Sequence, residues 1–154
     1  MTDVRRATVA DADLLARLLW DFNTEFETET DDADVLAARF ARILELDDVL
    51  ALIAGEADGF ALLTLRPAIW FDGPVSQLEE LYVVPALRDR GIGTAILDRA
   101  RELVRELGSP EMHINVDEVD TDTRRFYERH GFVNIEAGED YRMLCYIGPT
   151  GHDD

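Results

Sequence analysis

The stretch LEELYVVPALRDRGIGTAI, from Leu78 to Ile96, decides the fold. An apolar run that carries two glutamates leads into a proline, two arginines and two glycines, and apolar residues then recur at helical spacing. This pattern predicts a strand over residues 76–84, a glycine corner, and a helix over residues 93–107. Glycine tolerates positive φ, so several backbone N–H groups can converge in front of the helix N-terminus. The corner is therefore a candidate anion site that a pyrophosphate would fit.

Two common nucleotide-binding motifs do not fit this corner. The P-loop requires a lysine after its last glycine, and the sequence contains no lysine. The dinucleotide fingerprint requires a third glycine at the position of Ile96. Arg88 and Arg90 add positive charge beside Gly91 and Gly93. The corner is thus predicted to bind a phosphate-bearing ligand of another kind.

Hydrophobic periodicity predicts further elements on both sides of this stretch. Helices are expected at residues 8–26, 34–46 and 121–130. Strands are expected at residues 4–9, 49–55, 59–65, 112–118, 132–136 and 141–147. This order predicts an α/β fold of the α+β kind, with about four helices flanking a mixed sheet of about six to seven strands. A single domain is expected at residues 1–148, followed by a flexible tail at residues 149–154.

The composition excludes several classes of partner. The chain has 33 acidic and 15 basic residues and a net charge of -18, so it repels nucleic acid phosphates and anionic lipid. No apolar run is long enough to span a membrane. Cys145 is the only cysteine, which rules out an internal disulfide and suits a reducing cytoplasm. The acidity either attracts cationic small molecules or reflects coding bias or a high-salt cytoplasm.

Two motifs together resemble the GNAT family of N-acetyltransferases. The pattern R-x-x-G-x-G, which opens a helix after LYVVP, resembles motif A of that family. The segment DTDTRRFYERHGF at residues 120–132 resembles motif B, because Tyr127 and the pair Gly131-Phe132 match. Asp120 and Thr123 depart from it, since they stand where the family usually has Asn and Ala. The order of elements agrees with the family over roughly residues 3–147.

The resemblance implies a mostly antiparallel sheet in which one parallel strand pair forms a cleft for acetyl-CoA, the acetyl donor. It implies that backbone N–H groups of Val83 and Val84 stabilise the oxyanion and that Tyr127 protonates the leaving thiolate. The resemblance also implies a homodimer, and the lone cysteine favours a location in the cytoplasm. The residues that the resemblance places beside the coenzyme are Val83, Val84, Arg88, Arg90, Gly91, Ile92, Gly93, Thr94, Asp120 and Thr123.

A closer similarity concerns the acceptor. The segment WFDGPVSQLEELYVVPALRDRGIG is similar to spermidine/spermine (diamine) acetyltransferases, which implies that Glu79 is the general base and that Glu80 binds the amine. Neighbouring residues of a regular strand point to opposite faces, so only one of the two is expected to face the substrate.

Other polar and aromatic residues are candidates for the acceptor side. His113 and Asn115 share one face of the strand expected at 112–118, and His113 is a rival base. Trp70 and Phe71 either wall the acceptor pocket or cover a dimer contact. No C-x-x-C or H-E-x-x-H pattern is present, and His130 and His152 have no metal-like partners in the sequence, so no metal is predicted.

The sequence therefore predicts an N-acetyltransferase that moves an acetyl group from acetyl-CoA to a primary amine of a small cationic molecule. Polyamine-like acceptors are expected first, and aminoglycoside-like acceptors or an amino acid derivative come next. Direct attack in a ternary complex is preferred, because Cys145 is expected to be a small buried residue and not a nucleophile. The alternatives are a protein or peptide N-acetyltransferase and a non-catalytic acyl-CoA-binding regulatory domain.

Overall fold

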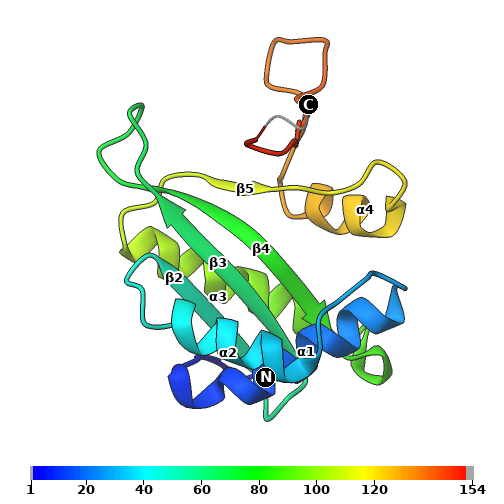
Figure 1. Ribbon diagram of the computed structural model, residues 1–154. Coiled ribbons are helices and arrows are strands. Elements are labelled where there is room, and N and C mark those ends of the chain that lie inside the picture. Colours follow the sequence, from blue (N-terminus) through cyan, green and yellow to red (C-terminus); the bar gives the residue numbers. More distant parts are fainter. Residues whose placement is uncertain (1, 152–154) are drawn as a thin grey trace. The chain divides into compact units, whose positions relative to one another are not determined.

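The computed structural model describes residues 2–151, and the part up to residue 114 forms a sheet with helices on both faces (Figure 1). The five strands are β1 (Val4–Arg6), β2 (Val49–Ala54), β3 (Gly59–Arg66), β4 (Val75–Val83) and β5 (Met112–Ile114). The four α-helices of the described residues are α1 (Ala12–Glu25), α2 (Ala33–Ile43), α3 (Ile92–Glu106) and α4 (Thr121–Arg129). Two short 3₁₀ helices, η1 (Val9–Asp11) and η2 (Pro85–Leu87), precede α1 and follow β4.

The strands lie in the order β1-β2-β3-β4-β5, which is also their order in the chain. All neighbours are antiparallel except β4 and β5, which are parallel and are joined through α3. The predicted α/β class, the mostly antiparallel sheet and the parallel pair around α3 are therefore confirmed. The sheet has fewer strands than expected.

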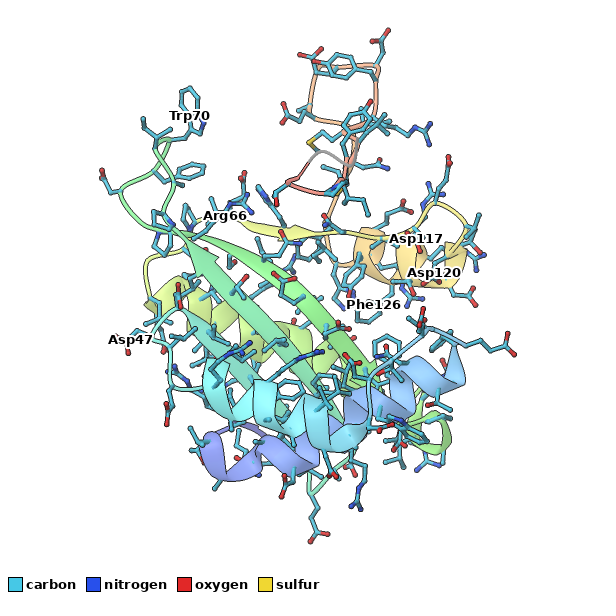
Figure 2. The ribbon with its side chains drawn as sticks, viewed as in Figure 1. Asp47, Arg66, Trp70, Asp117, Asp120 and Phe126 are labelled. Atoms are coloured by element: carbon cyan, nitrogen blue, oxygen red, sulfur yellow. The ribbon has the colours of Figure 1, made fainter. Side chains whose placement is uncertain are left out.

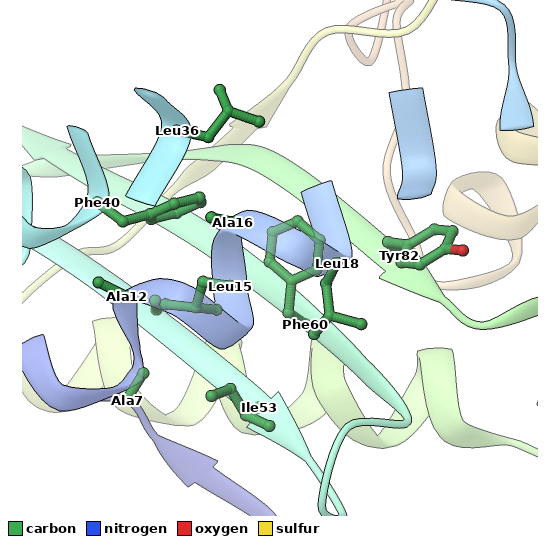
Figure 3. Packing of buried hydrophobic residues seen from close by; sticks show 11 residues of the cluster. Ala7, Ala12, Leu15, Ala16, Leu18, Leu36, Phe40, Ile53, Phe60 and Tyr82 are labelled. Carbon is green, nitrogen blue, oxygen red and sulfur yellow. The ribbon is translucent and has the colours of Figure 1, made fainter. Parts of the chain in front are cut away.

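The hydrophobic core has one layer on each face of the sheet. Leu15, Leu18 and Phe40 of α1 and α2 pack on one face against Ile53, Phe60 and Tyr82 (Figure 3). On the other face, α3 contacts the first four strands through its buried side chains. Ile96, Leu97 and Ala100 are fully buried there. Successive side chains of β2 point to opposite faces of the sheet. All six of its residues are buried, so β2 contributes to both layers.

The C-terminal part departs from the sequence prediction. Residues 132–136 and 141–147 form no strand, and a single backbone hydrogen bond of 2.7 Å, from Met143 N to Asn134 O, joins them. Apart from Phe132, their large apolar side chains are exposed, up to 95% for Ile147. A hairpin with no face packed on a core is not stable in water, which explains the missing strands. Cys145 is also exposed, so the expectation that it is buried was wrong.

The described residues fall into two compact units that meet after Ile114. The first contains the sheet, α1, α2 and α3, and the second contains α4 and the C-terminal segment. The single domain expected at 1–148 stays a prediction. Of the tail expected at 149–154, residues 152–154 lie outside the described range, as does His152. Among the described residues, no helix is both long and apolar enough to cross a membrane.

Candidate functional site

The glycine corner begins α3. Gly91 is the N-cap, has a φ of 81°, and offers no side chain to cap the helix. The first helical hydrogen bond runs from Ala95 N to Gly91 O at 3.0 Å, so the amides of Ile92 and Gly93 precede the helical ladder. These amides and the positive end of the helix dipole lie where the sequence predicts an anion site, and the binding of an anion there stays a prediction.

The left-handed conformation of Gly91 gives a stability prediction. We expect Gly91→Ala to lower the free energy of unfolding by about 1 kcal/mol, because a β-carbon is strained at positive φ. No heavy atom lies within 4 Å of that β-carbon, so no clash adds to the cost. Urea unfolding measures the change. The matched control is Gly148→Ala, where the space is equally open and φ is not in the left-handed region. Equal stabilities of the two variants would contradict this account.

Arg88 is held by the end of α1. Its guanidinium donates to both carboxylate oxygens of Glu25 at 2.6 and 2.8 Å, and its Nε donates to Val83 O at 3.0 Å. The guanidinium carbon also lies 5.8 and 5.6 Å from the ring centres of Phe26 and Tyr82. Glu25 thus neutralises the positive charge of Arg88, which the sequence analysis had expected to face an anionic ligand. Arg88 fixes the corner to β4 and α1, whereas Arg90 is exposed, and its predicted contact with a phosphate stays a prediction.

The Arg88–Glu25 pair gives a second prediction. A double-mutant cycle with Arg88→Gln and Glu25→Gln should show a coupling energy of about 1 kcal/mol, the upper range for partly exposed pairs, because the contact is bidentate. The control cycle uses Arg39 and Asp31, whose ion pair at 2.7 Å is more exposed. We expect a smaller coupling there, and urea unfolding measures both cycles. A larger coupling for the control pair would be evidence against the role of Arg88.

One edge of β4 is unpaired along half of its length. The parallel ladder with β5 ends at the pair Leu78–Ile114, so among the described strands nothing pairs with residues 79–83 on that side. The backbone groups of these residues that point away from β3 are available to an extended ligand, except Val83 O, which accepts from Arg88 Nε. The amide of Val84 is not available either, because it donates to Asp58 O at 2.9 Å. Of the two predicted oxyanion donors, only Val83 therefore remains.

A β-bulge places the two glutamates of β4 on the same face. Leu62 pairs with Glu80 and Leu63 pairs with Leu78, so Glu79 is the extra residue. The hydroxyl of Thr64 donates to Glu79 Oε1 at 2.8 Å. Leu62 and Thr64 point to the same face of β3, and both glutamates therefore point there too. The expectation of opposite faces was wrong because it assumed a regular strand.

Glu80 is the perturbed member of this pair. Burial, and secondly the negative charge of Glu79, raise the pKa of Glu80 to about 7. Both causes disfavour the ionised form. A carboxylate with this pKa can exchange a proton with an amine near neutral pH, as general bases do. The pair thus offers one exposed carboxylate, Glu79, and one half-buried carboxylate suited to proton transfer.

His113 is fixed between two charged side chains. Its Nδ1 lies 2.9 Å from a guanidinium nitrogen of Arg66, and its Nε2 lies 2.8 Å from Glu111 Oε2. The guanidinium can only donate, so Nδ1 must accept and Nε2 carries the proton. Neither nitrogen is left to take a proton from a substrate, which disfavours His113 as the base. Asn115 does not share a strand with it, because β5 ends at Ile114.

We call the polar side chains on this face the polar floor. It begins on β3 and β4 where the core contacts of α1 and α2 end, next to Leu62. Thr64 pairs with Gln77, which in turn pairs with His113, so these three lie side by side on adjacent strands. The members of the polar floor are Thr64, Arg66, Gln77, Glu79, Glu80 and His113.

Tyr127 is positioned by the end of its own helix, α4. Gly131, at a φ of 89°, donates to Glu128 O, and Phe132 N donates to Tyr127 O, which is a Schellman ending. The ring of Phe132 packs edge-on against Tyr127 at 5.9 Å. The Gly-Phe pair of the motif therefore fixes a buried tyrosine. At the other end, Asp120 caps α4 by accepting from Thr123 N at 3.4 Å (Figure 2).

Trp70 and Phe71 lie on the loop between β3 and β4, with Trp70 at its tip (Figure 2). They line a hollow of about 450 Å³ together with Gly108 and Pro110, which follow α3, and no member of the polar floor lines it. Trp70 is 87% exposed. This loop enters β4 at the end opposite the glycine corner. Their predicted contact with the acceptor stays a prediction.

Sequence reasoning missed Thr64, Arg66, Gln77 and Glu25. The signal for the first two was present, because Thr64 and Arg66 are polar residues at alternate positions of a strand that is otherwise apolar. Glu25 had no such signal. Among the described residues, no group of three or more His, Cys, Asp or Glu side chains could hold a metal ion.

The known proteins that this chain resembles are acetyltransferases. The profile of the acetyltransferase (GNAT) family matches residues 12–132. The chain is 31% identical over 135 residues to the aminoglycoside N(6')-acetyltransferase type 1 of Klebsiella aerogenes, covering 85% of this chain and 84% of that one. It is 30% identical over 83 residues, 54% of each chain, to the aminoalkylphosphonate N-acetyltransferase of Salmonella typhimurium. A crystal structure from Arthrobacter sp. FB24, assigned as an acetyltransferase, superposes with a TM-score of 0.90 at 47% identity, covering 96% of this chain and 95% of that one.

Proposed function

The chain belongs to the acetyltransferase (GNAT) family and is an acetyl-CoA-dependent N-acetyltransferase, and from this premise we propose that it acetylates the primary amine of a small molecule by direct attack in a ternary complex. The observation that carries the proposal is the carboxylate pair Glu79 and Glu80, which projects from the same segment of β4 whose edge is unpaired. A donor bound along that edge would present its thioester beside the pair.

The acceptor binds as an ammonium ion, because alkyl amines are protonated near neutral pH. Glu79 attracts this charge, and Glu80, with its pKa raised to about 7, takes the proton. The freed nitrogen lone pair attacks the thioester carbonyl carbon, and the backbone N–H of Val83 stabilises the oxyanion. The carbon–sulfur bond then breaks, and the nitrogen loses its second proton to solvent as the amide forms. We therefore propose Glu80 as the general base, in place of Glu79, which the sequence similarity implied.

The leaving thiolate takes a proton from Tyr127 in this proposal, and the phenolate then regains a proton from solvent. The phenol is protonated at neutral pH and can therefore donate. Support comes from the match to motif B and from the rigid ending of α4 that fixes the ring. Arg90 and the amides of Ile92, Gly93 and Thr94 are proposed to bind the pyrophosphate. Asp120 and Thr123, at the start of α4, remain proposed coenzyme contacts through their motif positions.

An assay of coenzyme A release over a panel of amines tests the proposal. The panel contains polyamines, which the sequence similarity favours, and aminoglycosides and aminoalkylphosphonates, for which two relatives are named. It also contains amino acids and short peptides. We expect acetyl transfer to at least one small amine. Transfer to peptides alone would refute the small-molecule acceptor, and binding of acetyl-CoA with no transfer to any amine would refute the reaction.

We also propose a homodimer in the cytoplasm. The C-terminal segment exposes many apolar side chains in the single chain, and large exposed apolar patches mark interaction surfaces. Sedimentation velocity should show twice the mass of one chain, and a monomer at assay concentrations would contradict this. The apolar residues of the segment that are exposed are Val133, Ile135, Tyr141, Met143, Leu144, Tyr146 and Ile147.

A further inference from the structure

The polar floor contains a fixed positive charge as well as the two carboxylates. We propose that the acceptor carries an anionic group, a carboxylate or phosphonate, in addition to its amine, and that Arg66 binds this group. The inference rests on the proposed function and narrows its substrate class from amines in general to amines with an acidic group.

The position of the guanidinium follows from the strand register. Arg66 ends β3, and its side chain reaches across β4 to bond His113 on β5 at 2.9 Å (Figure 2). Gln77 is the residue of β4 that pairs with His113, so the guanidinium lies over that part of β4. Glu79 follows two residues later, roughly 7 Å along the strand. Both charges are on the same face, since the Glu79 carboxylate bonds Thr64 of β3.

Arg66 is held in place without being neutralised. Among the described residues no carboxylate lies within ion-pair distance of it, although the chain has an excess of acidic residues. Its partner His113 accepts through Nδ1 and is itself fixed by Glu111. Glu111 therefore orients the imidazole, and the imidazole orients the guanidinium. An arginine in this state retains unused donors for a carboxylate or phosphonate, which it recognises by paired N–H bonds.

The arrangement discriminates between classes of amine. An amine with an anionic group a few bonds away places its ammonium beside Glu79 and Glu80 and its acid beside Arg66. A polyamine would bring a second ammonium toward the same guanidinium, and like charges repel. A simple alkyl amine would leave Arg66 without a partner. The polar floor thus favours ω-amino acids and aminoalkylphosphonates over polyamines as acceptors.

Matched pairs of acceptors test this inference. The pairs are γ-aminobutyrate with butylamine, and aminopropylphosphonate with propylamine, and spermidine is added as the polyamine. Coenzyme A release gives kcat/KM for the wild type, for Arg66→Gln, and for the control Arg99→Gln on α3, where Arg99 pairs with Glu102. We expect the wild type and the control to prefer the anionic member of each pair. Arg66→Gln should lose roughly ten- to a hundredfold in kcat/KM with that member and change little with the alkyl amine.

The outcomes separate this inference from the proposed function. Transfer without preference within the pairs, a preference for spermidine, or equal losses of Arg66→Gln on both members would each overturn the inference while leaving acetyl transfer intact. No transfer to any amine would overturn the proposed function, and this inference with it.

Discussion

The Glu80→Gln variant should lose about a hundredfold or more in kcat/KM, because general base catalysis contributes about 10²–10⁴ to such reactions. The amide keeps the size of the side chain but cannot accept a proton from the ammonium. Coenzyme A release with the best acceptor of the panel measures the loss. The KM for acetyl-CoA should change little, since Glu80 belongs to the polar floor and not to the glycine corner.

The pH profile distinguishes this role from a structural one. A base must be ionised to act, so kcat/KM of the wild type should rise with pH through about 7, the pKa of Glu80. The Glu79→Gln variant removes the negative charge that is the second cause of the raised pKa, so its rise should move to lower pH. The Glu80→Gln variant should show no rise in this range. If the rise persisted unchanged in Glu80→Gln, another group would be the base.

The pH dependence of the stability of Glu80→Gln tests the raised pKa of Glu80 independently of activity. The folded state binds the proton of Glu80 more tightly than the unfolded state does, because its pKa is raised. The ionised side chain therefore destabilises the wild type above pH 7, and this penalty vanishes below the unfolded-state pKa. Glutamine carries no such penalty. The stability of the variant relative to the wild type should thus increase as the pH rises from below about 4.3 to above 7.

The Tyr127→Phe variant has the second large effect. Loss of the phenol proton should lower kcat by about a hundredfold, with little change in the affinity for acetyl-CoA. The fold of α4 should survive, because phenylalanine keeps the ring that packs against Phe126 and Phe132. Stopped-flow release of coenzyme A and calorimetry with acetyl-CoA measure the two quantities. Tyr146→Phe is the control, since Tyr146 is 87% exposed.

Unchanged turnover of Tyr127→Phe would remove this residue from the mechanism. A parallel loss of coenzyme affinity would instead assign it a binding role. The control variant guards against a general effect of replacing a tyrosine in this part of the chain.

The parts of the site that follow from local sequence were predictable. Gly91 stands where a strand meets an amphipathic helix, and only glycine accepts its left-handed φ without strain. Gly131 and Phe132 end α4 by a Schellman motif whose signature lies within a few residues. In each case the backbone requirement and the residue that satisfies it are close in the chain.

The parts that depend on distant residues were not predictable. Arg88 meets Glu25 across 63 positions, and Arg66 meets His113 across 47. Neither pairing leaves a periodic trace in the sequence. The bulge at Glu79 is also invisible to alternation, because it arises from the register between β3 and β4. It reverses the expected direction of one side chain and so changes which glutamates share the site.

The prediction of two C-terminal strands was wrong for a related reason. The apolar side chains of YRMLCYI are typical of a strand, and period and propensity alone predicted one. A strand needs a partner and a packed face, and in this chain the segment has one backbone hydrogen bond to residue 134 and exposed apolar side chains.

The measurement that tests the central claim most directly is the identification of the reaction product by mass spectrometry. The purified protein is incubated with acetyl-CoA and its best amine, and coenzyme A release is followed in the same sample. We predict one acetyl group on the acceptor nitrogen, in an amount equal to the coenzyme A released, and its loss in Glu80→Gln. Release of coenzyme A with no acetyl group on any amine would contradict the account.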